Sequence, residues 1–490
     1  MTDVTTLGVV GAGPMGAGIA QIGLTAGMQV VLYDLNAEAL AKSGKDILGR
    51  IARMVEKGQL AEGYVADAET RLILAGGLEA FAPCQLVVEA IIERLEPKQK
   101  LFAALEAMVA PDAVLATNTS SLSVAAIASG CADKTRVCGL HFFNPVPLMK
   151  LVEVIVAPST SEATAATATA LSKTIGKVPV TVKDGPGFLV NLQGRAFATE
   201  ALAIVQEGVT DVATLDRIVR DGGGFRMGPF ELMDLTGIDV NFAATTYIYE
   251  GYQHDPRLKT TTLHELQFNA GRYGRKTGQG FHDYSAAAAK DADPAPEIGE
   301  ARPFAATIGE AAAGFDLLRA TGLSDGDGAT LIAPIGEDCS TACHRLGLDP
   351  AKTVAIDFTA VEKKHLTLMT APGGSAAAQP VAEWLRSHAF TVEVIKDSPG
   401  FVLQRMLAMI ANLGCELAQI GVGSPADIDL SMKLAQNYPR GPLEWAAWLG
   451  EAKTLTIMSQ LQAITGSDRY RPSLWLRRRA LLGLPVHQVD

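Results

Sequence analysis

The N-terminal third of the chain alternates between short apolar runs and longer stretches with helical periodicity. The apolar runs are "LGVV", "MQVVLYD", "QLVVEAI", "AVLATN", "RVCGLHFF", "KLVEVIVAP" and "VPVTVKD". Segments of helical pattern, such as "PMGAGIAQIGLTAG", separate several of them. Buried strands that alternate with helices are typical of a parallel sheet covered on both faces. We therefore predict an α/β, Rossmann-like doubly wound parallel sheet for residues 1–182.

The first predicted strand and helix enclose a glycine motif. Gly11, Gly13 and Gly16 form G-x-G-x-x-G directly after "LGVV", and the next strand ends at Asp34. Gly11 permits a tight turn, Gly13 lets the backbone approach a pyrophosphate, and Gly16 allows close packing of helix and strand. An acid at the place of Asp34 binds a ribose 2′-hydroxyl and repels a 2′-phosphate. The stretch predicts a site for NAD rather than NADP, and Met15 is included in it.

Polar residues stand at or just beyond the carboxyl ends of the predicted strands. They are Glu89, Ser120, His141 and Asn144. Ligands of open parallel sheets bind at that edge, which favours a functional role for His141 over that of a satisfied core histidine. Two structural alternatives stay open: Ser120 or Ser121 as a helix N-cap, and Asn144 as a turn former before proline.

One segment of the chain occurs twice. "KDGPGFLVN" (183–191) recurs 213 residues later as "KDSPGFVLQ" (396–404). The same offset relates Gly208 to Gly421, Asp216 to Asp429, Gly228-Pro229 to Gly441-Pro442, and Glu231 to Glu444. A single register without a gap indicates duplication. Because a long helical pattern follows each copy, we predict two helical domains, at residues 183–284 and 396–490.

The region between the two copies differs in composition. Residues 285–306 are rich in alanine and proline and are predicted to be a linker. "ATLIAPIGEDC", "KTVAIDF" and "HLTLMTAP" then give three strand-like runs, which echo the later strands of the first half. Because no glycine motif precedes them, we predict a truncated α/β segment at residues 307–395.

This echo lacks the polar residues of the first half. Asp357 stands in place of His141, Thr367 in place of Glu153, and Gln404 in place of Asn191. The polar set is complete only in the half that has a cofactor loop. The comparison favours chemistry over structure for the residues of the first half, although a solvent-facing strand position is an alternative for the glutamate.

The polar residues of the first half suit the oxidation of a secondary alcohol. Hydride transfer needs a base for the hydroxyl proton, and the ordinary pKa of the histidine side chain suits it to this role, for which His141 is the candidate. A carboxylate beside it fixes the tautomer and raises the basicity. We expect Glu153 to supply this carboxylate, because the two residues lie on successive strand-like runs. Ser120 and Asn191 are expected to bind the substrate oxygen.

Composition narrows the classes of function. Of the 490 residues, 48% are hydrophobic and 19% charged, and the net charge of −11 argues against a general nucleic-acid binder. No apolar run reaches about 18 residues and no basic signal region begins the sequence, so we expect a cytoplasmic protein without a membrane segment. Cys339 and Cys343 form C-x-x-x-C, but no second pair completes a metal site, and none is expected.

Together the motifs resemble the NAD-dependent 3-hydroxyacyl-CoA dehydrogenase family. The segments are "GAGPMGAGIA", "VVEAIIER", "NTSSL", "GLHFFNPVPLMKLVEV", "KDGPGFLVN", "MGPFELMDLTGID" and "GRKTGQGF". "NYPRGPLEWAAWLG" and "DRYRPSLWLRRRALLG" resemble the C-terminal extension of long bacterial members, some of which act on 3-hydroxyadipyl-CoA in phenylacetate breakdown. The resemblance implies oxidation of a (3S)-3-hydroxyacyl-CoA to the 3-ketoacyl-CoA, with NAD as the hydride acceptor.

The resemblance also implies roles for individual residues. It makes His141 the general acid/base and Glu153 its partner, with Ser120 and Asn191 at the substrate. The residues implied near NAD are Glu89, Arg94, Ser120, Asn144 and Lys276. Arg53 and Lys57 are expected to contact CoA phosphates, and Arg226 is the candidate cation for a dicarboxylic acyl chain.

The duplication suggests how the chain assembles, and two alternative functions stay open. Single-repeat members of the family dimerise through the helical domain, so the second helical domain is expected to replace that partner, and a higher oligomer stays open. The alternative function is an NAD-dependent dehydrogenase of the same build acting on a non-CoA hydroxy acid. The alternative class is a non-catalytic NAD-sensing module.

Overall fold

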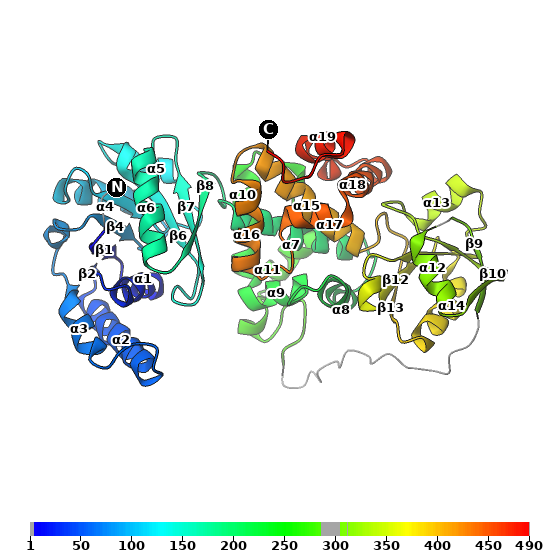
Figure 1. Ribbon diagram of the computed structural model, residues 1–490, viewed down its shortest axis with the longest axis horizontal. Helices are drawn as coiled ribbons and strands as arrows, with labels where there is room; N and C mark the ends of the chain where they lie inside the picture. The colour runs from blue at the N-terminus through cyan, green and yellow to red at the C-terminus, as the bar shows by residue number, and fades with distance from the viewer. Residues whose placement is uncertain (1–3, 286–303, 311, 490) are drawn as a thin grey trace. The chain divides into compact units, whose positions relative to one another are not determined.

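The chain forms two compact units. A computed structural model describes residues 4–285, 304–310 and 312–489. One unit comprises residues 1–192 with 421–436, and the other comprises residues 193–420 with 437–490. Figure 1 shows their helices and strands.

The first unit is built on an eight-stranded sheet with the order β3-β2-β1-β4-β5-β6-β7-β8. Its strands are β1 (Thr6–Val10), β2 (Gln29–Tyr33), β3 (Leu72–Leu74), β4 (Leu86–Glu89), β5 (Val114–Thr117), β6 (Val137–Phe142), β7 (Leu151–Val156) and β8 (Val178–Lys183). The helices between them are α1 (Pro14–Thr25), α2 (Ala37–Glu56), α3 (Tyr64–Arg71), α4 (Leu95–Met108), α5 (Val124–Ala128) and α6 (Glu162–Thr174). All neighbouring strands are parallel except β6 and β7. The predicted doubly wound sheet is confirmed.

The apolar runs of the sequence become strands because they are covered on both faces. Every residue of β1, β4 and β5 is buried. Ile19 of α1, Ile47 of α2 and Leu171 of α6 belong to the same core as Val9 and Val154 of the sheet. This packing fixes the carboxyl edge of the sheet, where the polar residues lie.

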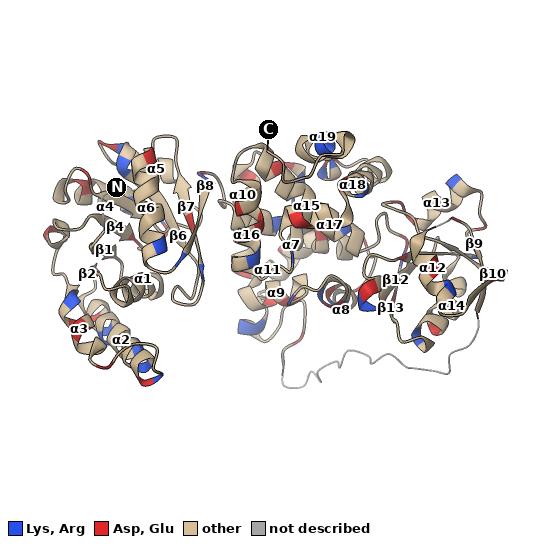
Figure 2. Ribbon diagram, in the orientation of Figure 1, with Lys and Arg blue, Asp and Glu red and all other residues tan. Residues whose placement is uncertain are grey.

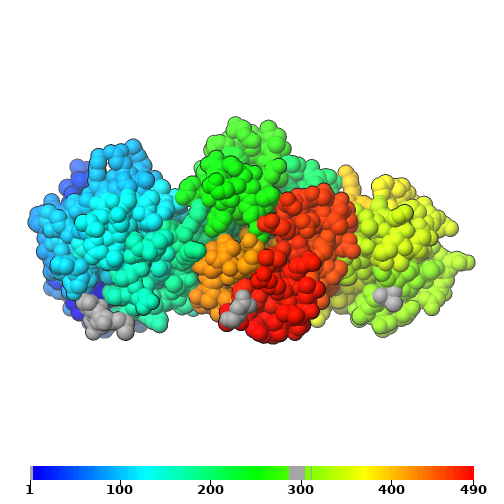
Figure 3. All heavy atoms as spheres, turned by 90° about the horizontal axis from the view of Figure 1, so that it is seen from above, coloured from blue at the N-terminus to red at the C-terminus, as the bar shows by residue number. Residues whose placement is uncertain are grey.

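One helix of the second repeat belongs to the first unit. α16 (Pro425–Gln436) packs on β7 and β8. The backbone N–H of Lys183, at the end of β8, donates to the carbonyl of Val422 over 2.9 Å. Figure 3 shows the orange atoms of this segment beside the blue-green atoms of the last strands. The domain limits expected from the sequence stay a prediction.

The second unit contains a five-stranded sheet with the order β13-β12-β11-β10-β9. Its strands are β9 (Phe304–Ile308), β10 (Leu323–Ile332), β11 (Thr353–Asp357), β12 (His365–Met369) and β13 (Thr391–Ile395), and its helices are α12 (Ala313–Ala320), α13 (Cys339–Leu346) and α14 (Ser375–Ser387). Sequence reasoning identified three of these strands and missed the two at the edges. An edge strand is covered on fewer sides, so β9 and β13 keep exposed and polar positions that weaken the apolar signal. Most of the predicted linker, residues 286–303, lies outside the described residues.

The second sheet repeats the pairing pattern of the first. In the second sheet β10 and β11 are parallel, β11 and β12 are antiparallel, and β12 and β13 are parallel. The first sheet has the same succession, with β5 and β6 parallel, β6 and β7 antiparallel, and β7 and β8 parallel. Asp357 pairs with Thr367 across β11 and β12, where His141 pairs with Glu153 across β6 and β7. The side chain of Gln404 donates from Nε2 to Asp357 Oδ1 over 3.1 Å. The register therefore confirms the correspondence between the two halves.

The remaining helices form the two copies of the helical repeat. The first copy has α7 (Val190–Gln206), α8 (Val212–Arg217), α9 (Pro229–Thr236), α10 (Ile238–Gly251) and α11 (Thr262–Asn269). The second has α15 (Leu403–Gln419), α16, α17 (Pro442–Leu449), α18 (Glu451–Thr465) and α19 (Leu474–Leu482). No helix in the described part of the chain is both long and apolar enough to cross a membrane.

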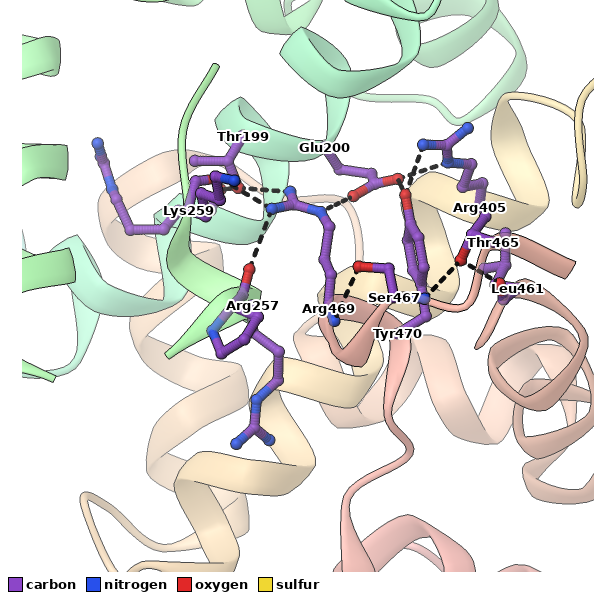
Figure 4. A network of polar contacts seen from close by, with 12 residues as sticks. Thr199, Glu200, Arg257, Lys259, Arg405, Leu461, Thr465, Ser467, Arg469 and Tyr470 are labelled. Carbon is purple, nitrogen blue, oxygen red and sulfur yellow. Dashed lines mark hydrogen bonds and ion pairs between the residues drawn. The ribbon is translucent and has the colours of Figure 1, made fainter. Parts of the chain in front are cut away.

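The two helical copies meet in a buried polar network (Figure 4). Glu200 of α7 accepts hydrogen bonds from Arg405 Nε of α15 (2.5 Å) and from Arg469 Nε (2.7 Å). The hydroxyl of Tyr470 donates to the same carboxylate over 3.0 Å. Burial raises the pKa of Glu200, but the charges of the two arginines outweigh it and lower that pKa below its ordinary value. The carboxylate is therefore held ionised between the copies.

Candidate active site

His141 and Glu153 face each other on two antiparallel strands. His141 is the penultimate residue of β6, and its Cα partner in β7 is Glu153. His141 Nδ1 lies 2.6 Å from Glu153 Oε2. The histidine is 6% exposed and the glutamate is fully buried. The predicted pair is thus brought together, and the alternative of a solvent-facing Glu153 is wrong.

The second oxygen of Glu153 is held by the backbone. Oε1 accepts hydrogen bonds from the N–H groups of Leu189 (3.1 Å) and Val190 (2.9 Å), where α7 begins. A helix N-terminus favours negative charge. Asn191 is the next residue of this helix, and its expected place at the substrate stays a prediction.

The pair has the arrangement of a general base with a fixed tautomer. Glu153 accepts two backbone N–H groups on Oε1, and its Oε2 is placed to accept the Nδ1–H of His141; in that tautomer the lone pair of the imidazole is on Nε2. The rings of Phe143 and Phe188 lie 4.5 and 5.7 Å from the imidazole ring, measured between centroids. These rings cover part of the imidazole, and no hydrogen bond of Nε2 occurs among the described residues.

Ser120 lies in the loop that follows β5. Its backbone N–H donates to Glu93 Oε1 over 2.9 Å, and its residue surface is exposed. The N-cap of α5 is Ser123, whose hydroxyl accepts from the N–H of Ala126. The alternative of Ser120 as the N-cap is therefore wrong. Its hydroxyl remains available at the edge of the sheet that carries His141.

Glu93 organises this loop and was not found from the sequence. Its Oε1 accepts from the hydroxyls of Thr119 (2.6 Å) and Ser121 (2.9 Å). Burial raises the pKa of Glu93, but these hydrogen bonds, the backbone of Ser120 and the charge of Lys98 lower that pKa overall. Glu93 could have been found from the sequence, because it stands directly before the expected Arg94 in "VVEAIIER".

Glu89 has a structural environment of its own. Its Oε1 accepts from Lys98 Nζ (2.6 Å) and from the N–H of Ile91 (2.7 Å), and its Oε2 accepts from the hydroxyl of Thr117 (2.7 Å). The carboxylate ties β4 to β5 and α4. Arg94, the N-cap of α4, is exposed. Their expected contact with NAD stays a prediction.

The glycine motif has the geometry that a dinucleotide loop requires. Gly11 has a φ of +105°, and a Cβ there would collide with the carbonyl of Ala90. A Cβ on Gly16 would collide with the carbonyl of Gly11, whereas one on Gly13 would meet open space. The loop leads into α1, whose N-cap Gly13 bears no side-chain cap. No side-chain cap occupies the N–H groups at the start of α1, which suits this end of the helix to a phosphate group.

Asp34 holds the other side of the loop. Its Oδ2 accepts from the N–H of Ala12 (2.8 Å) and its Oδ1 accepts from that of Asn36 (2.9 Å). Beside it is a pocket of about 330 Å³ that Leu40 and Leu74 help to line. An apolar pocket next to a carboxylate suits the adenosine end of NAD. Met15 is half-buried on α1. The residues present therefore fit NAD.

α2 carries a group of basic residues with few partners. Arg53 and Lys57, the C-cap residue of α2, are exposed, and their expected contacts with CoA phosphates stay a prediction. Arg50, one turn before Arg53, was missed, and its Nε and Nη2 are buried without a partner among the described residues. Figure 2 shows blue segments along this helix. The spacing i, i+3, i+7 was the available signal for Arg50.

Three expected residues are placed without contacts that test their roles. Asn144 is exposed at the end of β6, before Pro145, and the bond between them is cis. In the second unit, Lys276 Nζ pairs with Asp239 Oδ1 over 2.5 Å, and Arg226 is exposed. Their roles toward NAD or substrate stay predictions.

Comparison with known proteins gives the family. Residues 6–185 match the model of the 3-hydroxyacyl-CoA dehydrogenase NAD binding domain, and residues 187–284 and 400–485 match that of the C-terminal domain. The chain is 37% identical over 486 residues to 3-hydroxyadipyl-CoA dehydrogenase of Escherichia coli, with 98% of each chain covered. It is 40% identical over 291 residues to the mitochondrial hydroxyacyl-coenzyme A dehydrogenase of Homo sapiens, with 56% of this chain and 90% of the relative covered.

Solved structures agree with this assignment. The crystal structure of 3-hydroxybutyryl-CoA dehydrogenase from Escherichia coli matches with a TM-score of 0.87 at 37% identity, covering 98% of this chain and 99% of the other. That of (S)-3-hydroxybutyryl-CoA dehydrogenase from Ralstonia eutropha matches with a TM-score of 0.56 at 35% identity, covering 58% and 100%. The chain therefore belongs to the 3-hydroxyacyl-CoA dehydrogenase family and is an NAD-dependent dehydrogenase of that family.

Proposed function

We propose that His141 is the base that removes the hydroxyl proton when the chain oxidises a (3S)-3-hydroxyacyl-CoA to the 3-ketoacyl-CoA. The observation that carries this proposal is the 2.6 Å contact between His141 Nδ1 and Glu153 Oε2. Because two backbone N–H groups fix the other oxygen of Glu153, the imidazole is held in one orientation with Nε2 available.

The residues divide the work as follows. His141 Nε2 accepts the proton of the 3-hydroxyl group as the C–O bond becomes a carbonyl. The hydrogen on C3 leaves with its electron pair, and NAD supplies the acceptor for that hydride when it is bound. Glu153 stabilises the imidazolium that forms. Ser120 and Asn191 donate hydrogen bonds to the substrate oxygen and position it. In the reverse direction the same imidazolium returns the proton.

The test of the pair is the variant His141→Gln with Glu153→Gln beside it. We expect kcat to fall by about 10²- to 10⁴-fold in each, the range for loss of a general base, while the affinity for NAD is unchanged. His344→Gln, at an exposed position of α13, is the matched control and should keep full activity. Unchanged turnover in His141→Gln would contradict the proposal and show that another group accepts the hydroxyl proton.

For the substrate we propose 3-hydroxyadipyl-CoA, with 3-hydroxybutyryl-CoA as the shorter alternative. The support is the likeness over 98% of both chains to the relative named for the adipyl substrate. A matching structure bears the name of the butyryl enzyme. Rates should be compared for 3-hydroxyacyl-CoAs from four carbons upward, including 3-hydroxyadipyl-CoA and the free hydroxy acids. Equal rates on neutral and carboxylated chains would reject the dicarboxylate, and activity on free acids would favour the non-CoA alternative.

Arg226 is proposed as the cation for the distal carboxylate of that substrate. It is exposed, and no ion pair of its side chain occurs among the residues that the structure describes. The variant Arg226→Gln should lower kcat/KM for 3-hydroxyadipyl-CoA and leave the value for 3-hydroxybutyryl-CoA unchanged. An equal loss on both substrates would assign the residue a structural role.

We also propose that the second helical copy replaces the subunit with which single-repeat members of the family pair. The support is the packing of α7 on α15: Gln193 Nε2 of the first copy donates to the carbonyl of Ile410 of the second over 3.0 Å. The full chain should then be soluble without a partner, whereas a chain ending at residue 285 should aggregate or pair with itself. A soluble, fully active monomer of the short chain, measured by light scattering, would contradict this.

A further inference from the structure

The second unit contains a small pocket with two cations and two tryptophans. Its volume is about 160 Å³. Lys363 comes from the connection between β11 and β12, Arg440 immediately precedes the Gly-Pro start of α17, and Trp445 and Trp448 lie on α17. Apolar residues of α15 form another wall.

Comparison of the two repeats shows that this chemistry is particular to the second copy. At the offset of 213 residues, Arg440 stands in place of Met227, Trp445 in place of Leu232, and Trp448 in place of Leu235. The neighbouring Gly-Pro pair and the glutamate that follows it are the same in both copies. Three exchanges of an aliphatic or thioether side chain for arginine or tryptophan thus converge on one pocket.

Arg440 is stacked on aromatic rings rather than paired with an acid. Its guanidinium carbon lies 5.3 Å from the ring centroid of Trp445 and 5.1 Å from that of Trp448, within the range of cation–π attraction. Stacking uses the face of a guanidinium and leaves its N–H groups to other partners. Within the described ranges, no carboxylate forms an ion pair with this arginine.

Lys363 is a second cation without an ion pair among the described residues. A Cβ on Gly224 would collide with its Nζ, so the glycine makes room for the ammonium group. Burial and the charge of Arg440 lower the pKa of Lys363, and the opposing attraction of Asp221 is smaller. Asp221 is itself paired with Arg220. Two positive charges therefore repel each other without a shared counter-ion.

Trp445 supplies a third unsatisfied group. The residue is 2% exposed, and its Nε1–H has no acceptor in the described part of the chain. Buried donors in folded proteins are nearly always satisfied. Two cations without an ion pair and one buried donor without an acceptor therefore occur on residues that line the same pocket, and an oxyanion supplies the negative charge and the acceptor atoms that they lack.

We propose that this pocket binds a small oxyanion, a carboxylate or a phosphate group, between Arg440 and Lys363 with the two tryptophans as walls. Guanidinium groups bind both anions through paired hydrogen bonds. A cavity of about 150 Å³ holds a molecule of the size of benzene, so this pocket fits inorganic phosphate or a short carboxylic acid and excludes a whole acyl-CoA. The ligand is separate from the substrate of the His141 pair.

The first experiment is a titration of the full chain followed by tryptophan fluorescence and by thermal unfolding. The probes are sodium phosphate and, separately, sodium propionate, with sodium chloride at equal ionic strength as the reference. We expect a saturable fluorescence change and a raised Tm. Arg440→Met, which restores the residue of the first copy, should weaken binding at least about tenfold, and Glu362→Gln, which removes a carboxylate from the pocket wall, should tighten it.

A matched pair of lysine variants distinguishes binding in the pocket from a general effect of positive surface charge. Lys363 lines the pocket and its neighbour Lys364 does not. Lys363→Gln should weaken binding about tenfold, Lys364→Gln should leave it unchanged, and both should keep wild-type dehydrogenase activity without added anion. A response to phosphate alone indicates a phosphoester ligand, and one to propionate alone a carboxylic acid. Equal losses in the two lysine variants, or no response beyond that of sodium chloride, would overturn the proposal.

Discussion

The hydroxyls of two adjacent serines differ in what they already bind. Ser121 Oγ donates to Glu93 Oε1 over 2.9 Å, whereas Ser120 contributes its backbone N–H to the same carboxylate and keeps its hydroxyl. A hydroxyl that is already committed stabilises the loop. A free one, at the sheet edge that carries His141, is suited to a substrate oxygen.

Alanine variants of the two serines should therefore differ, one losing catalytic efficiency and the other losing stability. Ser120→Ala should lower kcat/KM about tenfold or more through loss of one hydrogen bond to the substrate, with an unchanged Tm. Ser121→Ala should lower the free energy of unfolding by about 1 kcal/mol with a smaller effect on turnover. Steady-state kinetics and urea unfolding of both variants measure this. The reverse assignment of the two losses would remove Ser120 from the substrate site.

The residues that sequence reasoning found and missed differ in a physical way. His141 and Glu153 stand out because apolar strands make every polar residue conspicuous. Glu93 and Arg50 lie in segments where charged residues are ordinary, one in a loop and one on an amphipathic helix. What marks them is their surroundings, namely the hydroxyls gathered on one carboxylate and the buried nitrogens of one guanidinium, and these exist only after folding.

At the scale of elements, the repeated motifs of the sequence serve as helix caps. Asp184 of "KDGPGF" accepts from the N–H groups of Val124 and Ala125 at the start of α5. Asp397 of "KDSPGF" accepts from those of Cys339 and Ser340 at the start of α13. The duplication therefore preserved a capping device even where the histidine and glutamate of the first half are absent.

A third cap joins α9 to a histidine and predicts a pH dependence. Asp216 accepts from the N–H groups of Phe230 and Glu231, and His282 Nε2 lies 2.8 Å from its Oδ2. This hydrogen bond raises the pKa of His282 above its ordinary value of 6.5, against the opposing effect of burial. A raised pKa in the folded state gives stability that is complete below about pH 6.5 and is lost as pH rises through the raised pKa.

The measurement is Tm between pH 6 and pH 8.5 for the wild type and for His282→Gln. We expect the variant to be less stable at pH 6 and the difference to shrink at the higher pH. His264→Gln is the control, because burial and the charge of Arg195 lower the pKa of His264 to about 4 and keep it neutral over this range. A constant difference between wild type and His282→Gln would show that the imidazolium contributes nothing.

For the molecule as a whole, the sequence predicted the duplication and the first sheet but not every assignment of its elements. The offset of 213 residues assigned α16 to the second helical copy, whereas this helix packs on β7 and β8 of the first unit. The periodicity of apolar residues predicts which face of a helix is buried, but it does not predict which element that face packs against. The edge strands β9 and β13 were not predicted from the sequence, because a strand at the edge of a sheet buries fewer apolar side chains.

The buried network around Glu200 is the strongest candidate for the joint between the two copies. Replacing this carboxylate by glutamine leaves Arg405 and Arg469 without their shared charge, and loss of one member of a buried ion pair costs about 3–5 kcal/mol. Glu207 binds the same Arg405 but its side chain is 46% exposed. Solvent screens such a pair, so Glu207→Gln should cost about 1 kcal/mol or less.

Urea unfolding of Glu200→Gln and Glu207→Gln tests this difference, and light scattering follows association. Because the network joins α7 to α15, we expect the first variant to unfold at a lower urea concentration and to expose surface that promotes self-association. The second variant should lose about 1 kcal/mol or less in urea unfolding and should not self-associate. Equal and small losses would mean that apolar packing between the helices, and not the charges, holds the copies together.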